Sequence, residues 1–194
     1  MRRITDYELN QKMIEEYNLN LLDYNKMQKY YNGEHDIIAN YYNIEGRSNQ
    51  ITVDNFVQKF IDEEVNYSLG NAITITSRTG NTDIINAINK NTFHWNVDHN
   101  QTLMKIMEIF GTVYELHYID NKGRFCERLL NPTNAICYCD IDGVPKRFIH
   151  FYKLKYDGAK YYDVYYSDGR IEVYKDNNLI KTTNHCFKGI PVSV

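Results

Sequence analysis

The chain has 194 residues, 25 acidic and 22 basic side chains, and a formal net charge of −3. This length is enough for one sizeable core or two small ones, and the charge lacks the basic surplus that is typical of ordinary DNA-binding proteins. The four cysteines form no CxxC pair, the N-terminus MRRITDYELN has no apolar signal region, and no apolar run approaches the ~20 residues that cross a bilayer. We therefore expect a protein of a reduced, cytoplasmic compartment that does not bind a membrane.

The first predicted element is a long helix. Thr5 and Glu8 have the spacing of a capping box, in which the hydroxyl and the carboxylate satisfy each other's backbone donors. The helix should continue to about Tyr31, and Gly33 should break it. Residues 36–50 are polar and rich in tyrosine, which predicts a loop.

A second helix is predicted over residues 52–69, followed by a strand at residues 72–75. Thr52 is the expected N-cap and Gly70 the expected left-handed residue at the C-terminal end. The apolar side chains of this segment recur at helical spacing on one face, which predicts a helix that faces the core: Val53, Phe56, Val57, Phe60 and Ile61.

Two shorter helices should follow, at residues 82–90 and 98–110, the second ending at Gly111. From residue 112 the apolar period changes to two, and Asp-Gly or Asn-x-Gly turns recur at short intervals. Antiparallel strands are therefore expected throughout residues 112–183. The predicted fold class is α+β, with N-terminal helices packed on an antiparallel β-meander.

We expect residues 1–48 to form an N-terminal helix and loop, and residues 49–194 to form one α+β domain. Within the second part, Glu64 projects near the centre of the apolar helix face. A buried carboxylate needs a partner, so Glu64 should form an ion pair or lie in a subunit contact, although a catalytic acid is the alternative. The candidate subunit-interface or packing residues are Glu64, Phe60, Tyr67, Phe110 and Tyr114.

A second candidate surface is basic. Arg147, Lys153 and Lys155 share one face of a predicted strand, and Lys160 follows the next turn. Interleaved tyrosines suit either a nucleic acid or an acidic protein, so these four residues form a candidate partner-facing patch. Ile149 and Phe151 lie on the same face, however, which favours a subunit contact with a charged rim.

No combination of residues predicts an active site. Asp140 and Asp142 resemble the start of a calcium loop, but the later ligands are missing and a hairpin turn is the expected structure. The six histidines lack metal-ligand spacing, Cys137 and Cys139 should be buried thiols, and adjacent side chains such as His185 and Cys186 should point apart. We expect no enzyme activity, no catalytic residue, no metal and no cofactor.

Four segments occur in a particular order: YYNGEHDI at residues 30–37, YSLGNAI at 67–73, FGTVYE at 110–115 and HCFKGIPV at 185–192. In this order they resemble portal proteins of tailed bacteriophages and prophages, especially those of Gram-positive hosts. The resemblance extends over nearly the whole chain. It implies that the chain corresponds to the wing-like N-terminal part of a portal protein.

The resemblance implies a structural subunit of a ring at one capsid vertex, located in the virion and in the host cytoplasm during assembly. DNA passes through such a ring during packaging and ejection without sequence-specific binding, while the terminase hydrolyses ATP. The implied partners are copies of the chain itself, the capsid, the terminase and head–tail adaptor proteins.

In similar proteins the chain continues well beyond the HCFKGIPV segment. The expectation is therefore a truncated fragment that is monomeric or weakly associated. The alternative is a stand-alone, prophage-derived module that binds nucleic acid or an acidic protein, which predicts salt-sensitive DNA binding that is lost in Lys153→Glu/Lys155→Glu. A third reading, an enzyme that uses Glu64 or Cys186, has the weakest support.

Overall fold

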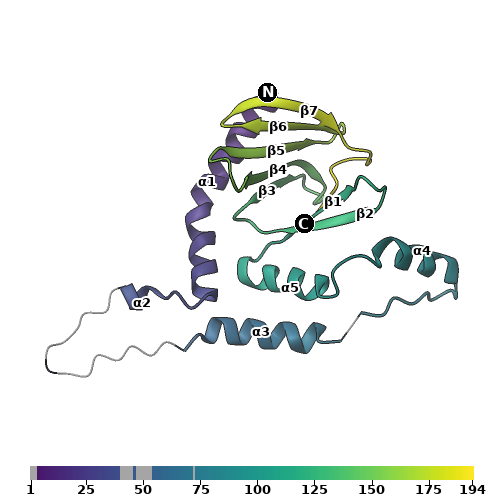
Figure 1. The fold of residues 1–194 in the computed structure, drawn as a ribbon, viewed down its shortest axis with the longest axis horizontal. Coiled ribbons are helices and arrows are strands. Elements are labelled where there is room, and N and C mark those ends of the chain that lie inside the picture. The colour runs from purple at the N-terminus through teal and green to yellow at the C-terminus, as the bar shows by residue number, and fades with distance from the viewer. Residues whose placement is uncertain (1–3, 40–45, 47–53, 72) are drawn as a thin grey trace.

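A computed structural model describes residues 4–39, 46, 54–71 and 73–194 (Figure 1). Its helices are α1 (Asp6–Tyr31), α2 (Asp36–Ala39), α3 (Phe56–Leu69), α4 (Thr82–Thr92) and α5 (His99–Phe110). Its strands are β1 (Tyr114–Ile119), β2 (Phe125–Leu130), β3 (Ala135–Cys139), β4 (Pro145–Lys153), β5 (Lys160–Tyr166), β6 (Arg170–Lys175), β7 (Asn178–Asn184) and β8 (Val192–Ser193). The α+β fold class is confirmed.

The strands form two sheets rather than the single meander that we expected. The order β3-β4-β5-β6-β7 makes the large sheet, and β2-β1-β8 makes the small one. The hairpin of β1 and β2 does not continue into β3, which pairs with β4 instead. The other edge of β1 is taken by β8, which returns from the end of the chain and pairs through Leu116 and Val192. Apolar side chains fill the space between the two sheets: Tyr114, Leu116, Leu130, Ala135, Phe148 and Val192.

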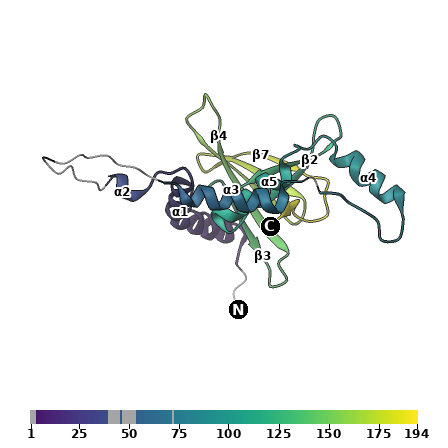
Figure 2. The same cartoon turned by 90° about the horizontal axis from the view of Figure 1, so that it is seen from below.

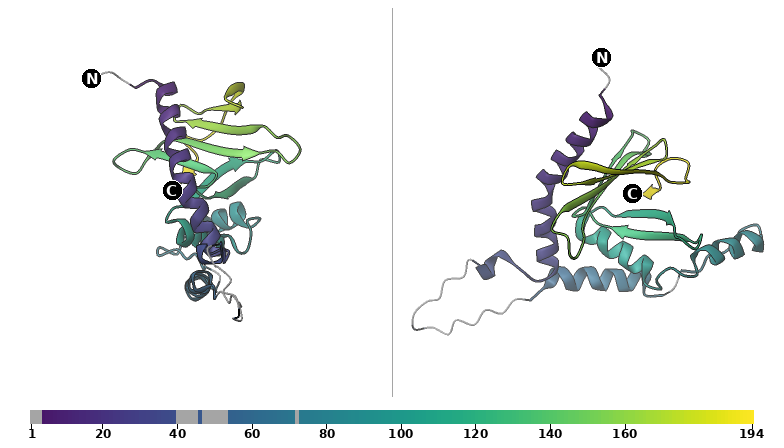
Figure 3. Two further views of the ribbon diagram at one scale, coloured as in Figure 1. Left: turned by 90° about the vertical axis from the view of Figure 1, so that its left-hand side faces the viewer. Right: turned by 45° about the horizontal axis from the view of Figure 1, so that its top comes forward.

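Helix α1 covers the other face of the large sheet (Figure 3). Its capping box is confirmed, since the Thr5 hydroxyl accepts from the Glu8 amide at 3.2 Å and the Glu8 carboxylate accepts from the Thr5 amide at 2.9 Å. Met13 packs against sheet residues that include Ile149, which is fully buried. The ring of Tyr17 stacks on Phe151 at a centroid distance of 4.0 Å. The centre of the large sheet is therefore buried on both faces, whereas its edge strand β7 is mostly exposed.

The helix predicted over residues 52–69 begins later than expected. Asn55 is its N-cap, with a side chain that accepts from the Gln58 amide at 3.1 Å, whereas Thr52 lies outside the described residues. The predicted left-handed conformation of Gly70 is wrong, because its φ is −63°. A glycine is needed there for another reason: an added Cβ would meet the Asn66 carbonyl oxygen at 2.3 Å.

Two further expectations for this region are wrong. Residues 73–76 form no strand, and Ile73 and Ile75 are exposed because no neighbouring strand pairs with them. Helix α3 does not face the core either, since Val65 is its one buried residue. Figure 1 shows why: α5 lies between α3 and the two sheets, and Figure 2 shows α3 over α5 from below. Residues 36–39, which were expected to be part of a loop, form the short helix α2.

Helices α4 and α5 confirm the two shorter predicted helices. Gly111 ends α5 in the left-handed conformation, with φ of 73°, and its amide donates to the Met107 carbonyl at 2.7 Å. Among the described residues, no helix combines the length and the apolar character that crossing a bilayer requires.

The buried histidine of β4 should make stability depend on pH. Burial lowers the pKa of His150 from 6.5 to about 4, and the charge of Arg128 acts in the same direction. As pH falls from 6.5 toward 4, the unfolded chain takes up a proton before the folded chain does, so the folded state loses stability. At about 1.4 kcal/mol per pKa unit, the full loss is roughly 3 kcal/mol.

We expect His150→Phe to remove this part of the pH dependence. Chemical denaturation at pH 7 and pH 4 should show a smaller loss of stability in the variant than in the wild type. Burial raises the pKa of Asp163, the cross-strand neighbour of His150, so protonation of Asp163 adds stability to the folded state as pH falls. It is present in both proteins, so their difference isolates His150. Equal losses of stability in the two proteins would show that His150 does not cause this part of the pH dependence.

Candidate assembly surfaces

Helix α3 is held in place by a small number of polar contacts. The Lys105 ammonium of α5 lies 2.9 Å from the Asp62 carboxylate, and the Tyr31 hydroxyl of α1 donates to the same carboxylate at 2.9 Å. The side-chain amide of Asn55 donates to the backbone carbonyl of Tyr31 at 2.7 Å. These contacts fix one side of α3 against α1 and α5 and leave its other side uncovered.

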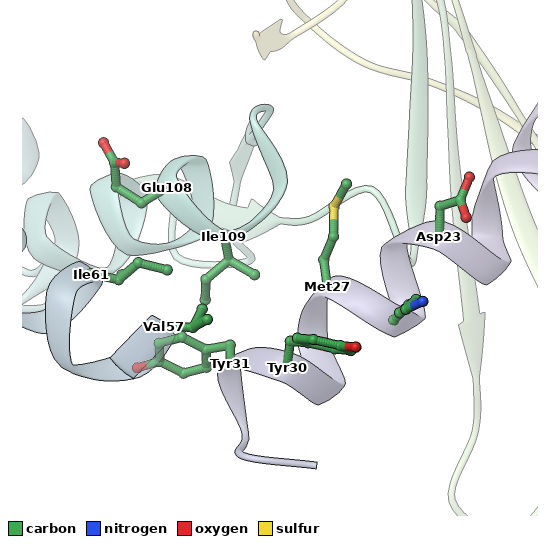
Figure 4. Close-up of a pocket in the computed structure, with 9 residues that line it drawn as sticks. Asp23, Met27, Tyr30, Tyr31, Val57, Ile61, Glu108 and Ile109 are labelled. Carbon is green, nitrogen blue, oxygen red and sulfur yellow. The ribbon is translucent and has the colours of Figure 1, made fainter. Parts of the chain in front are cut away.

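A groove of about 440 Å³ lies where the end of α1, the start of α3 and the end of α5 meet (Figure 4). Tyr31, Val57 and Ile109 converge in the close-up, one from each helix. The apolar lining is Met27, Tyr30, Tyr31, Val57, Ile61 and Ile109, and the charged rim is Asp23, Lys26 and Glu108. The Lys26 ammonium lies 3.1 Å from the Asp36 carboxylate, and the other two charged side chains of this rim, Asp23 and Glu108, are acidic. We call this site the α1/α3/α5 groove.

Exposed aromatic rings continue the apolar surface along α3. Phe56 and Phe60 stack with their centroids 6.1 Å apart, and Phe60 is 62% exposed. Tyr67, two turns further on, is 93% exposed. Exposed aromatic side chains of this kind are typical of a protein–protein contact.

The candidate interface residues separate into two groups. Phe110 and Tyr114 are buried inside the subunit and serve packing, and burial raises the pKa of the Tyr114 hydroxyl. Phe60, Tyr67 and Glu64 lie on the exposed side of α3. The expectation of a buried Glu64 is wrong, because the face of α3 that packs runs through Ile61 and Val65 and turns Glu64 toward solvent.

Arg147 does not belong to the basic patch. It is 6% exposed, because it points into the contact between β4 and α1. Its guanidinium donates to the Asn10 side chain at 2.7 Å and to the Asp6 carboxylate at 2.8 Å, and it lies 3.9 Å from the centroid of the Tyr166 ring. The hydrogen bond from Arg147 is the main reason that the pKa of Asp6 is lowered.

The three lysines of the patch are exposed, but carboxylates lie among them. Lys153 and Lys160 are cross-strand neighbours at the end of the β4–β5 hairpin, and Lys155 lies in the loop because β4 ends earlier than predicted. Asp157 pairs with Lys175 at 2.9 Å, and Asp176 accepts from the Lys160 amide. The surface is therefore of mixed charge, which is less suited to a phosphate backbone than the patch that we expected.

The structure also reveals a buried polar cluster that sequence reasoning missed. The two ring nitrogens of His99 lie 2.9 Å from a Glu115 oxygen and 3.3 Å from a Glu127 oxygen. Trp95 packs against the His99 ring at a centroid distance of 4.9 Å. The cluster ties the start of α5 to the small sheet. The residues are far apart in sequence, so no spacing could have revealed it.

The remaining candidate sites are structural. Within the described ranges, no group of three or more His, Cys, Asp or Glu residues could hold a metal ion. Asp140 accepts from the amides of Asp142 and Val144, as a hairpin turn requires. The sulfur atoms of Cys137 and Cys139 are 3.8 Å apart as free thiols, and Cys186 is exposed.

The helical layer and both sheets fall within one match to a known family. The sequence model described as phage portal protein, SPP1 Gp6-like, matches residues 10–194. The chain belongs to the phage portal protein family. A comparison with curated proteins gave no match. The family assignment confirms the resemblance carried by the four ordered segments, and it gives this portal protein a structural role in the virion. Such a role implies an oligomeric ring at the capsid vertex.

Proposed function

We propose that this portal protein is a subunit of the head–tail connector ring through which DNA enters the capsid and later leaves it. The family match over residues 10–194 carries the proposal. The exposed apolar side of α3 supports it, because a ring subunit needs such surfaces for its neighbours. In this proposal residues 49–194 form the wing-like domain, and residues 1–48 are the helix and loop attached to it.

The subunit acts as a passive conduit and docking platform rather than as an enzyme. Phe60, Tyr67 and Glu64 contribute to subunit contacts, and the exposed lysines Lys153, Lys155 and Lys160 face a protein partner. The capsid, the terminase and a head–tail adaptor are the proposed partners, and the terminase supplies the ATP hydrolysis. DNA passes through the ring without sequence-specific contacts. Assembly takes place in the host cytoplasm.

The location of the chain in phage particles tests this proposal. Particles induced from the host that encodes the chain should contain peptides from residues 10–194 in mass spectrometry. An antibody raised against the large sheet should label a single vertex of tailless, DNA-free heads in electron microscopy. Label spread over the whole shell, or particles without these peptides, would contradict the proposed function.

A further inference from the structure

Helix α4 presents an apolar ridge that is only partly covered. Ile84, Ile85 and Ile88 lie on one face of this helix, at the spacing of an amphipathic helix. Ile84 is 57% exposed, Ile85 and Ile88 are half-buried, and no side chain of α4, all of which is described, is fully buried. The helix projects from the body beyond the small sheet (Figures 1 and 3). We call Ile84, Ile85 and Ile88 the α4 ridge.

The α4 ridge and the α1/α3/α5 groove lie apart along the long axis of the molecule, because α4 lies beyond the start of α5, whereas the groove lies at the end of α5, where α1 meets α3 (Figures 1 and 2). The ridge of one chain therefore cannot enter the groove of the same chain. Two different surfaces on opposite sides of a subunit are what a head-to-tail contact between identical copies requires, and repetition of such a contact closes into a ring when the rotation allows it.

We propose that the α4 ridge of one subunit docks into the α1/α3/α5 groove of the next. The proposal rests on the proposed ring function and names the surfaces that make the contact. An amphipathic helix that lays its apolar face into an apolar groove is a recurrent mode of recognition, in which side chains at positions i, i+3 and i+4 are the anchors. Ile84, Ile85 and Ile88 provide this spacing, and the lining of the groove is mostly apolar.

The charges at the two surfaces are complementary. Asp23 and Glu108 stand on the rim of the groove, while Asp36 neutralises its one lysine. Lys90 lies in the last turn of α4 and Arg78 precedes the helix, both are exposed, and Asp83 is the one acidic residue between them. An acidic rim disfavours an acidic partner, so these charges are compatible with a second copy of the chain.

Complementary variants test the contact. The ridge variant Ile84→Glu/Ile88→Glu keeps an intact groove, and the groove variant Val57→Glu/Ile61→Glu keeps an intact ridge. We expect wild-type protein to associate with rising concentration in sedimentation velocity, and each variant alone to associate at least tenfold more weakly. An equimolar mixture should recover a 1:1 heterodimer that grows no further, because the mixture contains only one usable combination of ridge and groove.

A matched control lies on the same helix. Asn86→Glu/Asn89→Glu adds the same charge to the exposed polar side of α4 and should associate as the wild type does. If the groove variant fails to fold, Met27→Cys/Ile85→Cys in a Cys186→Ser background provides the second test. Oxidation should then produce disulfide-linked multimers that neither single cysteine gives.

Three results would overturn the contact. One is a ridge variant that associates as strongly as the wild type. Another is a wild-type chain that stays monomeric at every concentration and forms no cross-linked multimers. The third is a folded groove variant that yields no heterodimer with the ridge variant, which would mean that the ridge does not enter this groove. Vertex labelling of phage heads is independent of all three, so a failed contact and a failed portal function are distinguishable.

Discussion

Replacement of Arg147 by methionine should lower the free energy of unfolding by about 3 kcal/mol, because the buried guanidinium loses its hydrogen bonds to Asn10 and Asp6 and each bond to a charged group contributes roughly 1.5–3 kcal/mol. The guanidinium joins α1 to the large sheet through Asp6 and Asn10. Methionine approximates its length but cannot donate, so the buried side-chain oxygen of Asn10 loses its partner. The measurement is chemical denaturation followed by circular dichroism.

The effect should extend through the polar network around Tyr166. Arg170 lies 3.9 Å from the centroid of this ring, as Arg147 does, and binds Glu172 at 2.6 Å and Asp6 at 3.2 Å. Loss of Arg147 leaves α1 attached by the apolar contacts of Met13 and Tyr17 and by the weaker polar contacts of Asp6 with Arg170 and of Asn10 with Tyr166. Limited proteolysis should cut the variant within residues 5–31 faster than the wild type.

Arg124→Met is the matched control. Arg124 also forms a short ion pair, 2.7 Å from Asp120, but its side chain is 47% exposed in a hairpin. Exposed pairs contribute about 0–1 kcal/mol, so this substitution should change stability by less than 1 kcal/mol. Equal effects of the two substitutions would show that the buried network does not hold α1 to the sheet.

Replacement of His99 by leucine should cost about 3 kcal/mol, because largely buried carboxylates lose a hydrogen-bonding partner. Glu115 and Glu127 are largely buried and share the two ring nitrogens of His99. Leucine leaves both carboxylates without this partner, and the contact between α5 and the small sheet should weaken.

Two further variants isolate the role of His99. His117→Leu makes the same substitution nearby, where the ring lies 3.1 Å from the Ser193 hydroxyl and 3.9 Å from Glu115, and it should cost only about 1 kcal/mol. Addition of Glu115→Gln and Glu127→Gln to His99→Leu should restore part of the lost stability, because the unpaired charges are gone. Thermal unfolding at pH 7 measures all of them. A His99→Leu protein as stable as the wild type would show that Glu115 and Glu127 do not need His99 as a partner.

Local chemistry made several elements predictable. The capping box of Thr5 and Glu8 begins α1, Gly111 ends α5 in the left-handed conformation, and turns centred on Asp120 and Asp140 close hairpins. These features depend on residues within about one turn of each other, so the sequence contains all the information that they need. The family resemblance was likewise readable, because it depends on ordered short segments.

Burial was less predictable, as Arg147 and α3 illustrate. Arginine is a residue type that usually lies on the surface. Arg147 is nevertheless covered by α1, which supplies Asp6 and Asn10 from the opposite end of the sequence. Helix α3 has an apolar face that normally marks a core helix, but α5 covers only one side of it and leaves Phe60 exposed. An apolar face shows that a helix has a partner. It does not show whether that partner lies in the same chain or in another.

The sequence by itself determined the α+β class, the main helices, most strands and membership of the portal family, because each depends on short-range pattern. Only the tertiary structure decided that the strands divide into two sheets, that His99 joins Glu115 and Glu127, and that the α4 ridge lies away from the α1/α3/α5 groove. These features depend on contacts between residues distant in sequence, and such contacts are set by how the layers pack rather than by any local spacing.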